Sequence, residues 1–250
     1  MIYVTGDTHG KKDLGKLFSN NWPQGQKLTR DDFLIVCGDF GGIWMPGKRD
    51  DEILGWWESQ PWTTLFVDGN HENFDVIDSL EETERWGGRV QTMPGHEHIV
   101  HLMRGEVYDL PASVGQTVCT LVMGGARSRD RKYRAEGIDW WEREMPSEEE
   151  YDRCTASLER VGWKVDYVLT HELPADLRMS VLDWRSYAEL SSQADRLVSF
   201  LQWVYERIDH NALRMWYAGH YHVDAAATDK VRVLYQDVVP MDSAEHDELD

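Results

Sequence analysis

Five short apolar runs in this sequence are each followed at once by a side chain of the kind that binds metals. One run, Phe33–Cys37, passes through Gly38 directly to Asp39. The other four runs lead into Gly6-Asp7-Thr8-His9, Gly69-Asn70-His71-Glu72, Thr170-His171 and Gly219-His220-Tyr221-His222. Short apolar runs bounded by glycine are typical of buried strands, and a polar residue at a strand's exit lies at the open edge of a sheet. We therefore expect five strands to bring Asp, Asn and His side chains to one edge.

These five runs span residues 2–222 of a 250-residue chain and have to converge, so we expect a single domain over residues 1–239. Residues 240–250 form an acidic tail that we expect to be disordered. Acidic residues outnumber basic ones by 45 to 26, which gives a net charge of −19. Such a charge disfavours binding to duplex nucleic acid or to an anionic membrane, since both select clustered positive charge.

The three cysteines are spread through strand-like and helix-like segments and are expected to be reduced core thiols. They are Cys37, Cys119 and Cys154. The N-terminus lacks the charged lead and apolar core of a secretory signal, and no stretch reaches the ~18 apolar residues of a membrane span. We therefore expect a soluble protein of the cytoplasm.

Helical periodicity alternates with the apolar runs, which predicts an α/β fold with parallel pairing at its centre. Helices are expected at residues 11–18, 50–60, 73–80, 147–161 and 194–208. Between residues 87 and 123 the pattern changes to short extended runs broken by turns, which favours a second and more antiparallel sheet. A last hairpin is expected from residues 223–227 and 231–235.

The polar groups at the five strand ends offer oxygen and imidazole nitrogen, a mixture that suits Mn, Fe or Zn better than Ca or Mg. Seven such groups are too many for one ion. A carboxylate shared between two cations ~3.5–4 Å apart would divide the remaining ligands between them and form a site for a phosphoryl oxygen.

The five blocks, taken together and in this order, resemble the signature blocks of the calcineurin-like metallophosphoesterases. The resemblance implies a four-layer αββα β-sandwich of two mixed sheets flanked by helices. It also implies two divalent metal ions, with Mn as the first choice and Fe or Zn as alternatives, and Asp39 as the bridging ligand. One ion would be held by Asp7, His9, Asp39 and His222, and the other by Asp39, Asn70, His171 and His220.

The activity implied by the resemblance is hydrolysis of phosphate esters, by in-line attack of a hydroxide that bridges the two metals. His71 corresponds to a residue that assists the leaving group and binds no metal. The protein-phosphatase members pair this histidine with an aspartate three residues after the bridging one, whereas this chain has Gly42 there. Glu72 or Asp75 could replace that partner. His96, His98, His101 and His210 match no block, and we expect them to be structural.

A basic segment, residues 127–134, carries five Arg and Lys side chains in eight positions of an acidic protein. It either forms a solvated loop or binds the substrate's phosphate, with Arg127 as the best single candidate. Trp44, Trp140 and Trp141 could flank a base, although packing is their more usual role.

The expected partner is a small phosphorylated substrate, a nucleotide or a phosphoprotein. Alternative functions are a phosphodiesterase or nuclease acting on nucleotides or short nucleic acid, and an inactive scaffold that keeps the fold.

Overall fold

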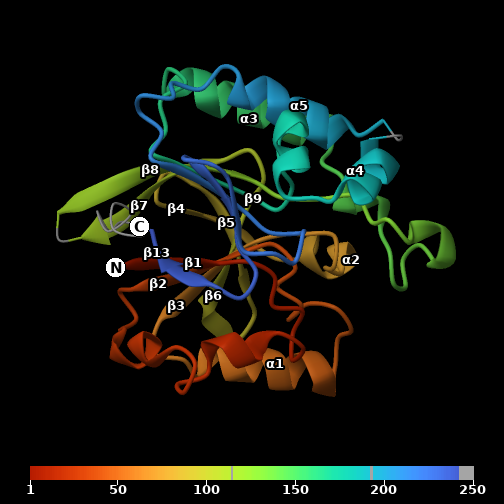
Figure 1. Cartoon of the computed structure of the whole chain (residues 1–250). Helices are drawn as coiled ribbons and strands as arrows, with labels where there is room; N and C mark the ends of the chain where they lie inside the picture. The colour runs from red at the N-terminus through yellow and green to blue at the C-terminus, as the bar shows by residue number, and fades with distance from the viewer. Residues whose placement is uncertain (114, 192–193, 242–250) are drawn as a thin grey trace.

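The computed structural model describes residues 1–113, 115–191 and 194–241, which form two β-sheets packed face to face (Figure 1). The first sheet has the strand order β13-β1-β2-β3-β6-β5-β4. Its strands are β1 (Ile2–Thr5), β2 (Phe33–Cys37), β3 (Thr63–Val67), β4 (Glu82–Arg85), β5 (Gly88–Met93), β6 (His96–Leu102) and β13 (Val238–Pro240). The second sheet has the order β11-β12-β10-β9-β8-β7. Its strands are β7 (Val107–Ser113), β8 (Gln116–Met123), β9 (Tyr167–Thr170), β10 (Met215–Ala218), β11 (Ala225–Thr228) and β12 (Val231–Val233).

Both sheets are parallel at the centre and antiparallel toward the edges. In the first sheet β1, β2, β3 and β6 run parallel, and in the second β8, β9, β10 and β12 do. Parallel neighbours end at the same side of a sheet, so the residues that follow β1, β2 and β3 come together. The residues that follow β9 and β10 come together in the same way. This arrangement positions the polar residues identified in the sequence.

Helices cover the outer face of each sheet and complete the four expected layers (Figure 1). They are α1 (Lys48–Glu58), α2 (Phe74–Ile77), α3 (Glu148–Arg160), α4 (Trp184–Ser191) and α5 (Arg196–Tyr205). The short 3₁₀ helices are Leu14–Leu17, Pro23–Lys27, Arg131–Tyr133, Glu142–Glu144 and Ala175–Ser180. Strand β2 illustrates the layering, because Ile35 packs between the sheets while its neighbours Leu34 and Val36 pack with α1. A strand buried on both faces reads as a continuous apolar run.

Two of the expected helices follow directly from local signals in the sequence. Helix α3 begins at a capping box in which Ser147 and Glu150 satisfy each other's backbone N–H groups. Helix α1 buries Ile53, Leu54 and Trp57 on one face. The helix expected at residues 11–18 is only a 3₁₀ turn, Leu14–Leu17, and helix α4 had no counterpart among the predictions.

The assignment of residues 87–123 to a second sheet is wrong for half of that segment. Strands β5 and β6 join the first sheet, where β6 pairs in parallel with β3, and only β7 and β8 belong to the second. The antiparallel texture comes from the hairpin pairs β5–β6 and β7–β8. Hairpins reveal local pairing and do not indicate which sheet a pair extends.

The C-terminal strand β13 pairs antiparallel with β1, so Pro240 lies within the fold, opposite Tyr3. The rest of the predicted acidic tail, residues 242–250, lies outside the described residues. The cysteines are free thiols, as expected, and Cys37 and Cys154 are buried. In the described part of the chain, no helix is long and apolar enough to cross a membrane.

Candidate metal centre

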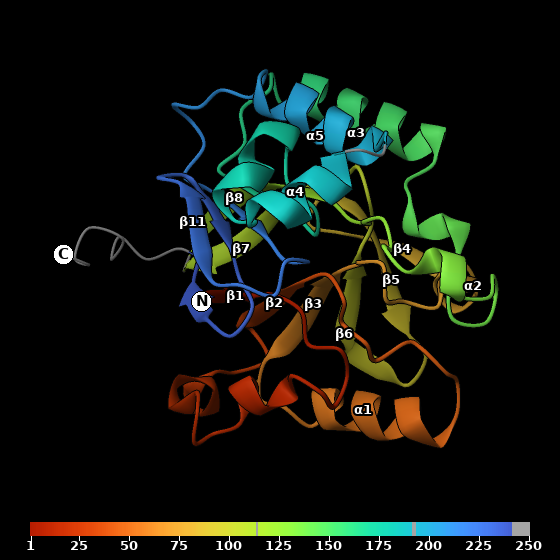
Figure 2. The same ribbon diagram turned by 45° about the vertical axis from the view of Figure 1, so that its right-hand side comes forward.

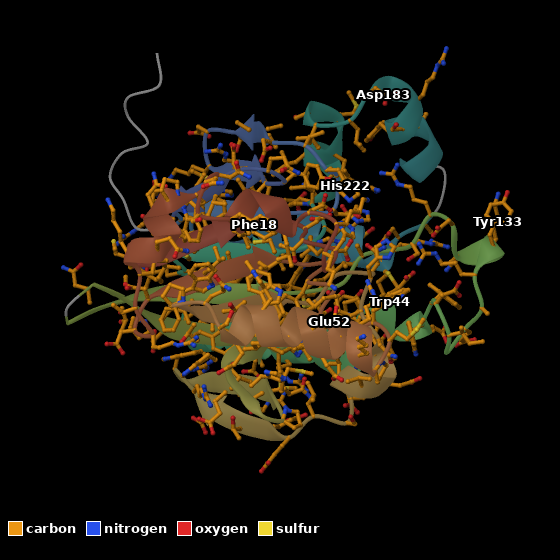
Figure 3. All side chains as sticks on the ribbon, turned by 90° about the horizontal axis from the view of Figure 1, so that it is seen from below. Phe18, Trp44, Glu52, Tyr133, Asp183 and His222 are labelled. Atoms are coloured by element: carbon orange, nitrogen blue, oxygen red, sulfur yellow. The ribbon has the colours of Figure 1, made fainter. Side chains whose placement is uncertain are left out.

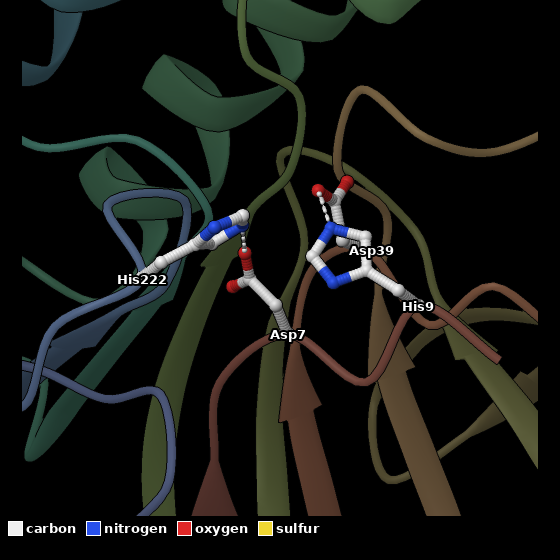
Figure 4. A group of neighbouring side chains, drawn as sticks. All are labelled: Asp7, His9, Asp39 and His222. Carbon is white, nitrogen blue, oxygen red and sulfur yellow. Dashed lines mark ion pairs between the residues drawn. The ribbon is translucent and has the colours of Figure 1, made fainter. Parts of the chain in front are cut away.

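The ends of the five strands meet, and four of the predicted ligands form one compact cluster (Figure 4). Asp7 and His9 follow β1, Asp39 follows β2, and His222 follows β10. One ligand atom from each of these four residues lies within 4.8 Å of every other. His9 Nε2 is 3.1 Å from Asp39 Oδ2, and His222 Nε2 is 3.0 Å from Asp7 Oδ2. This is the set of residues expected to hold the first ion.

The residues expected to hold the second ion lie on the other side of Asp39. His171 Nε2 is 3.3 Å from Asp39 Oδ1 and 3.3 Å from Asn70 Oδ1. The His220 ring lies 5.0 Å from the His171 ring, measured between centroids. Asp39 therefore contacts one group through Oδ2 and the other through Oδ1, which is the geometry that a shared ligand requires.

The chemistry of this donor set fits divalent cations. Burial alone would raise the pKa of Asp39, but the neighbouring histidines, above all His171, outweigh burial and hold this pKa well below its ordinary value. Burial would likewise lower the pKa of His171, yet Asp39 and Asp7 raise it to about 10. Asp39 therefore remains ionised, and an ionised carboxylate among imidazole side chains is a suitable ligand for a divalent cation. His220 Nε2 is buried and, among the described residues, has no hydrogen-bond partner, as expected of an atom that binds a metal.

Hydrogen bonds behind the cluster orient two of the histidines. His9 Nδ1 donates to Asp13 Oδ2 at 2.8 Å, and Asp13 Oδ1 accepts a hydrogen bond from the Tyr235 hydroxyl at 2.9 Å. His171 Nδ1 donates to the Cys37 carbonyl oxygen at 2.9 Å. In the neutral form that binds a metal, these bonds place the hydrogen of each ring on Nδ1 and leave Nε2 available as the ligand atom. Neither Asp13 nor Tyr235 was identified from the sequence, although a carboxylate four residues after His9 was a usable signal.

Lys16, which no sequence pattern marks, contacts the same region through its ammonium group. Its buried ammonium group donates to the backbone carbonyl oxygens of Gly6 at 3.0 Å and Asp7 at 2.8 Å, and also to that of Tyr235. One side chain thereby ties the end of β1 to the segment that follows β12. The contact fixes the Asp7 carbonyl oxygen by a hydrogen bond.

Four predicted ligands have a left-handed backbone, which is rare for residues other than glycine. The φ angles are 44° at His9, 51° at Asp39, 71° at His220 and 53° at His222, four of the six such angles at described non-glycine residues. The conformation at Asp39 is held by its own side chain, whose Oδ1 accepts the backbone N–H groups of Asn70 and His71 at 2.9 Å each. Strained backbone of this kind is concentrated at functional sites.

The glycines before the ligands are required by close packing. A Cβ atom on Gly38 would lie 2.0 Å from His171 Nδ1, and one on Gly219 would lie 2.4 Å from Asp7 Oδ1. Both distances are shorter than any real contact of a Cβ atom. The repeated pattern of glycine before a polar residue therefore reflects how closely the ligands approach the neighbouring strand ends.

His71 lies beside this cluster, and its ring contacts a positively charged side chain instead of a carboxylate. The two carboxylates suggested as its partner are bound elsewhere, so that suggestion is wrong. Glu72 accepts the backbone N–H groups of Phe40 and Gly69, and Asp75 accepts the Trp141 indole N–H. The group at His71 Nδ1 is the guanidinium of Arg134, at 3.4 Å. Burial lowers the pKa of His71, and Arg134 lowers it further, against the opposing effect of Asp39.

A cavity of about 360 Å³ opens over the cluster. It is lined by Asp39, Asn70, His71, Arg129, Asp130, Arg134, His220, Tyr221 and His222. Two arginines of the basic segment therefore lie on its wall. Arg127 is not among the lining residues, and its Nη1 donates to the Ala194 carbonyl oxygen at 2.7 Å, so its role in substrate binding stays a prediction.

Two of the tryptophans considered from the sequence, Trp44 and Trp141, pack near His71 and do not line the cavity. The Trp44 ring packs on His71 with 5.8 Å between centroids, and Figure 3 shows Trp44 on the same side of the molecule as Tyr133. Trp141 is buried against Trp44.

His101, expected to be structural, is buried, and its ring nitrogens are hydrogen-bonded to the Gln91 and Asp68 side chains.

Comparison with known proteins agrees with this geometry. A family model described as calcineurin-like phosphoesterase matches residues 1–224, a range that includes all seven predicted ligands and His71. No curated protein matches the chain significantly.

Proposed function

Because the chain belongs to the calcineurin-like phosphoesterases, we propose that it is a metal-dependent hydrolase of phosphate esters with a binuclear centre. The observation that carries this proposal is the position of Asp39 between two groups of ligands. Its Oδ2 lies against His9, and its Oδ1 lies against His171.

Asp7, His9, Asp39 and His222 would hold one cation, and Asp39, Asn70, His171 and His220 would hold the other. The mixture of imidazole and oxygen ligands suits Mn, with Fe and Zn as alternatives. When bound, two divalent cations stabilise charge on phosphoryl oxygens and make water acidic enough to act as a nucleophile.

The chain's own residues would bind and orient the substrate. Arg129 places positive charge on the cavity wall, where it can attract a phosphate group. His71 lies beside Asp39, in reach of a leaving group that departs into the cavity. The volume of about 360 Å³ is in the range of small-molecule sites, which favours a phosphomonoester or a nucleotide over a phosphoprotein.

The alternatives have less support. Hydrolysis of phosphodiesters in nucleotides uses the same site, but the net charge of −19 disfavours long nucleic acid as a substrate. An inactive scaffold would not need seven ligands in contact or the strained backbone at four of them.

The test combines metal analysis with substitution of two aspartates. Wild-type protein depleted of metal and reconstituted with Mn²⁺ is expected to hold two ions per chain and to hydrolyse members of a panel of phosphomonoesters, phosphodiesters and nucleotides. Asp39→Asn should lose more activity and more metal than Asp7→Asn, because Asp39 serves both ions and Asp7 serves one. Full hydrolysis by protein that holds no metal would disprove the proposal, as would equal metal content in the two variants.

A further inference from the structure

The residue that contacts His71 Nδ1 is Arg134, at the end of the basic segment 127–134. The sequence left two roles open for this segment, a solvated loop and a site for the substrate's phosphate. Arg134 follows the 3₁₀ helix Arg131–Tyr133, in the stretch between β8 and α3 that Figure 2 shows beside α2. This stretch is attached to α2 and its C-terminal end by the hydrogen bond from Trp141 to Asp75 and by the ion pair of Arg143 with Asp78. Arg134 therefore approaches the metal-ligand cluster from a different element than any of the ligands.

Contacts on both sides hold the Arg134 guanidinium in place. Its Nε is 2.8 Å from Asp130 Oδ1, and its Nη1 donates to the Asp139 carbonyl oxygen at 3.0 Å. The side chain is only 17% exposed. Asp139 also closes the loop, because its carboxylate accepts the Ala135 N–H. A guanidinium fixed in this way can point an N–H group of Nη1 at His71 Nδ1.

The chemistry of arginine determines which nitrogen of His71 carries the hydrogen. A guanidinium has only donors and keeps its proton in proteins, so His71 Nδ1 has to accept where it meets Arg134. The single hydrogen of the neutral ring is then on Nε2. We propose that Arg134 is a positioning residue that fixes the ring orientation and tautomer of His71, so that Nε2–H is available to the leaving-group oxygen.

The contact between Arg134 and His71 lies where other family members have an aspartate, but it favours the opposite tautomer of the neutral histidine. An aspartate at Nδ1 accepts the hydrogen of that nitrogen, so a neutral ring then has a bare Nε2. The N–H of Arg134 at Nδ1 instead favours the neutral tautomer that carries its hydrogen on Nε2. Gly42 offers no side chain, and no carboxylate in the described parts of the chain is hydrogen-bonded to His71 Nδ1. The part concerning the leaving group rests on the proposed hydrolase function, whereas the tautomer does not.

The tautomer can be measured directly in protein without metal. Long-range ¹H–¹⁵N correlation of histidine-labelled protein, above about pH 8 where an ordinary histidine is neutral, distinguishes the two ring nitrogens. The His71 signals are identified by their loss in His71→Ala. We expect hydrogen on Nε2 in wild type and a mixture of tautomers in Arg134→Met. Arg160→Gln removes a positive charge from an exposed position at the end of α3, and it should leave the His71 signals unchanged.

Kinetics then test whether Arg134 acts through His71. On an alkyl phosphate, Arg134→Met should lower kcat roughly 10–100-fold with KM within about twofold of wild type. In the His71→Ala background the same substitution should cause no further loss. Arg134→Lys keeps the charge but loses the planar fork that reaches three partners, so it should also lower kcat.

The outcomes separate this proposal from the proposed function. Hydrogen on Nδ1 in wild type, or identical His71 signals in wild type and Arg134→Met, would overturn the role of Arg134. A raised KM and an undiminished loss in the His71→Ala background would show that Arg134 binds the substrate directly, which also overturns it. If the wild-type protein hydrolyses no phosphate ester while the tautomer changes as expected, the hydrolase function fails and the Arg134–His71 contact stands.

Discussion

Substitution of Gly38 by alanine is expected to damage one half of the proposed metal centre selectively. Gly38 has a φ of +88°, where a residue with a side chain costs about 1–2 kcal/mol. The new methyl carbon would lie 2.0 Å from His171 Nδ1, against the 3.4 Å at which ordinary contacts begin, so the buried ring would have to move by about 1.4 Å. That movement breaks the hydrogen bond from His171 to Cys37. Overpacking of this kind costs a further ~1–3 kcal/mol.

We therefore expect Gly38→Ala to lower the free energy of unfolding by at least about 2 kcal/mol, which lowers Tm by at least roughly 4 °C for a chain of this length. Metal content should fall from two ions toward one, because His171 is displaced while the cluster of His9 and His222 is not touched directly. Thermal unfolding, denaturant titration and elemental analysis measure these effects.

Gly55→Ala is the matched control for this experiment. Gly55 lies on the exposed side of α1, and a Cβ atom there would meet nothing within 4 Å. Alanine in the middle of a helix should stabilise the protein by about 0.5–1 kcal/mol and leave the metal content unchanged. Wild-type stability and two bound ions in Gly38→Ala would refute the claim that close packing against His171 requires glycine.

Two further predictions concern the leaving group and the stability of the fold. His71→Ala should keep both metals but lower kcat roughly 10²–10⁴-fold on alkyl phosphates, with a smaller loss on nitrophenyl phosphates, whose leaving groups need little help; equal losses on both would show that His71 does not act on the leaving group. Burial raises the pKa of Glu150, but Arg104, the Ser147 N–H and Arg143 outweigh burial, and the folded-state pKa is lowered below 4.5. Its stabilising contribution is therefore present above pH 4.5 and lost as the pH falls through the folded-state value. Urea unfolding should show Glu150→Gln about 1–3 kcal/mol less stable than wild type near pH 7, with the gap closing in acid, and a gap independent of pH would contradict this assignment.

The strands and the main helices could be predicted because their signals are local. Strand β2 is a run of five apolar residues between Asp32 and Gly38, and α3 is preceded by its own capping box. Pairing between distant strands is a different matter. β6 lies beside β3 although α2 and the β4–β5 hairpin intervene in the chain, and no pattern within β6 specifies that neighbour.

The positions of the proposed metal ligands at the strand ends could be predicted for a related physical reason. Each of them must follow a strand directly, and the close approach of the strand ends requires glycine just before Asp7, Asp39, Asn70 and His220, so ligand and glycine appear together in the sequence. The residues that orient the ligands obey no such constraint. Asp13 and Tyr235 are 222 positions apart and meet only because β1 and the segment after β12 are neighbours in the folded chain.

The partner of His71 shows where reasoning from the sequence stops. Gly42 reveals that an acidic partner is missing, but the sequence does not say what lies at Nδ1 in its place. Residues 127–134 offer four arginines with equal chemistry, and the sequence favours Arg127 only because it is the first of them after the strand. In the folded chain Arg127 turns to the Ala194 carbonyl, while the 3₁₀ turn and the Asp130 ion pair bring Arg134 back to the cavity. The path of an irregular loop, and not the type of residue, therefore selects which arginine meets the histidine.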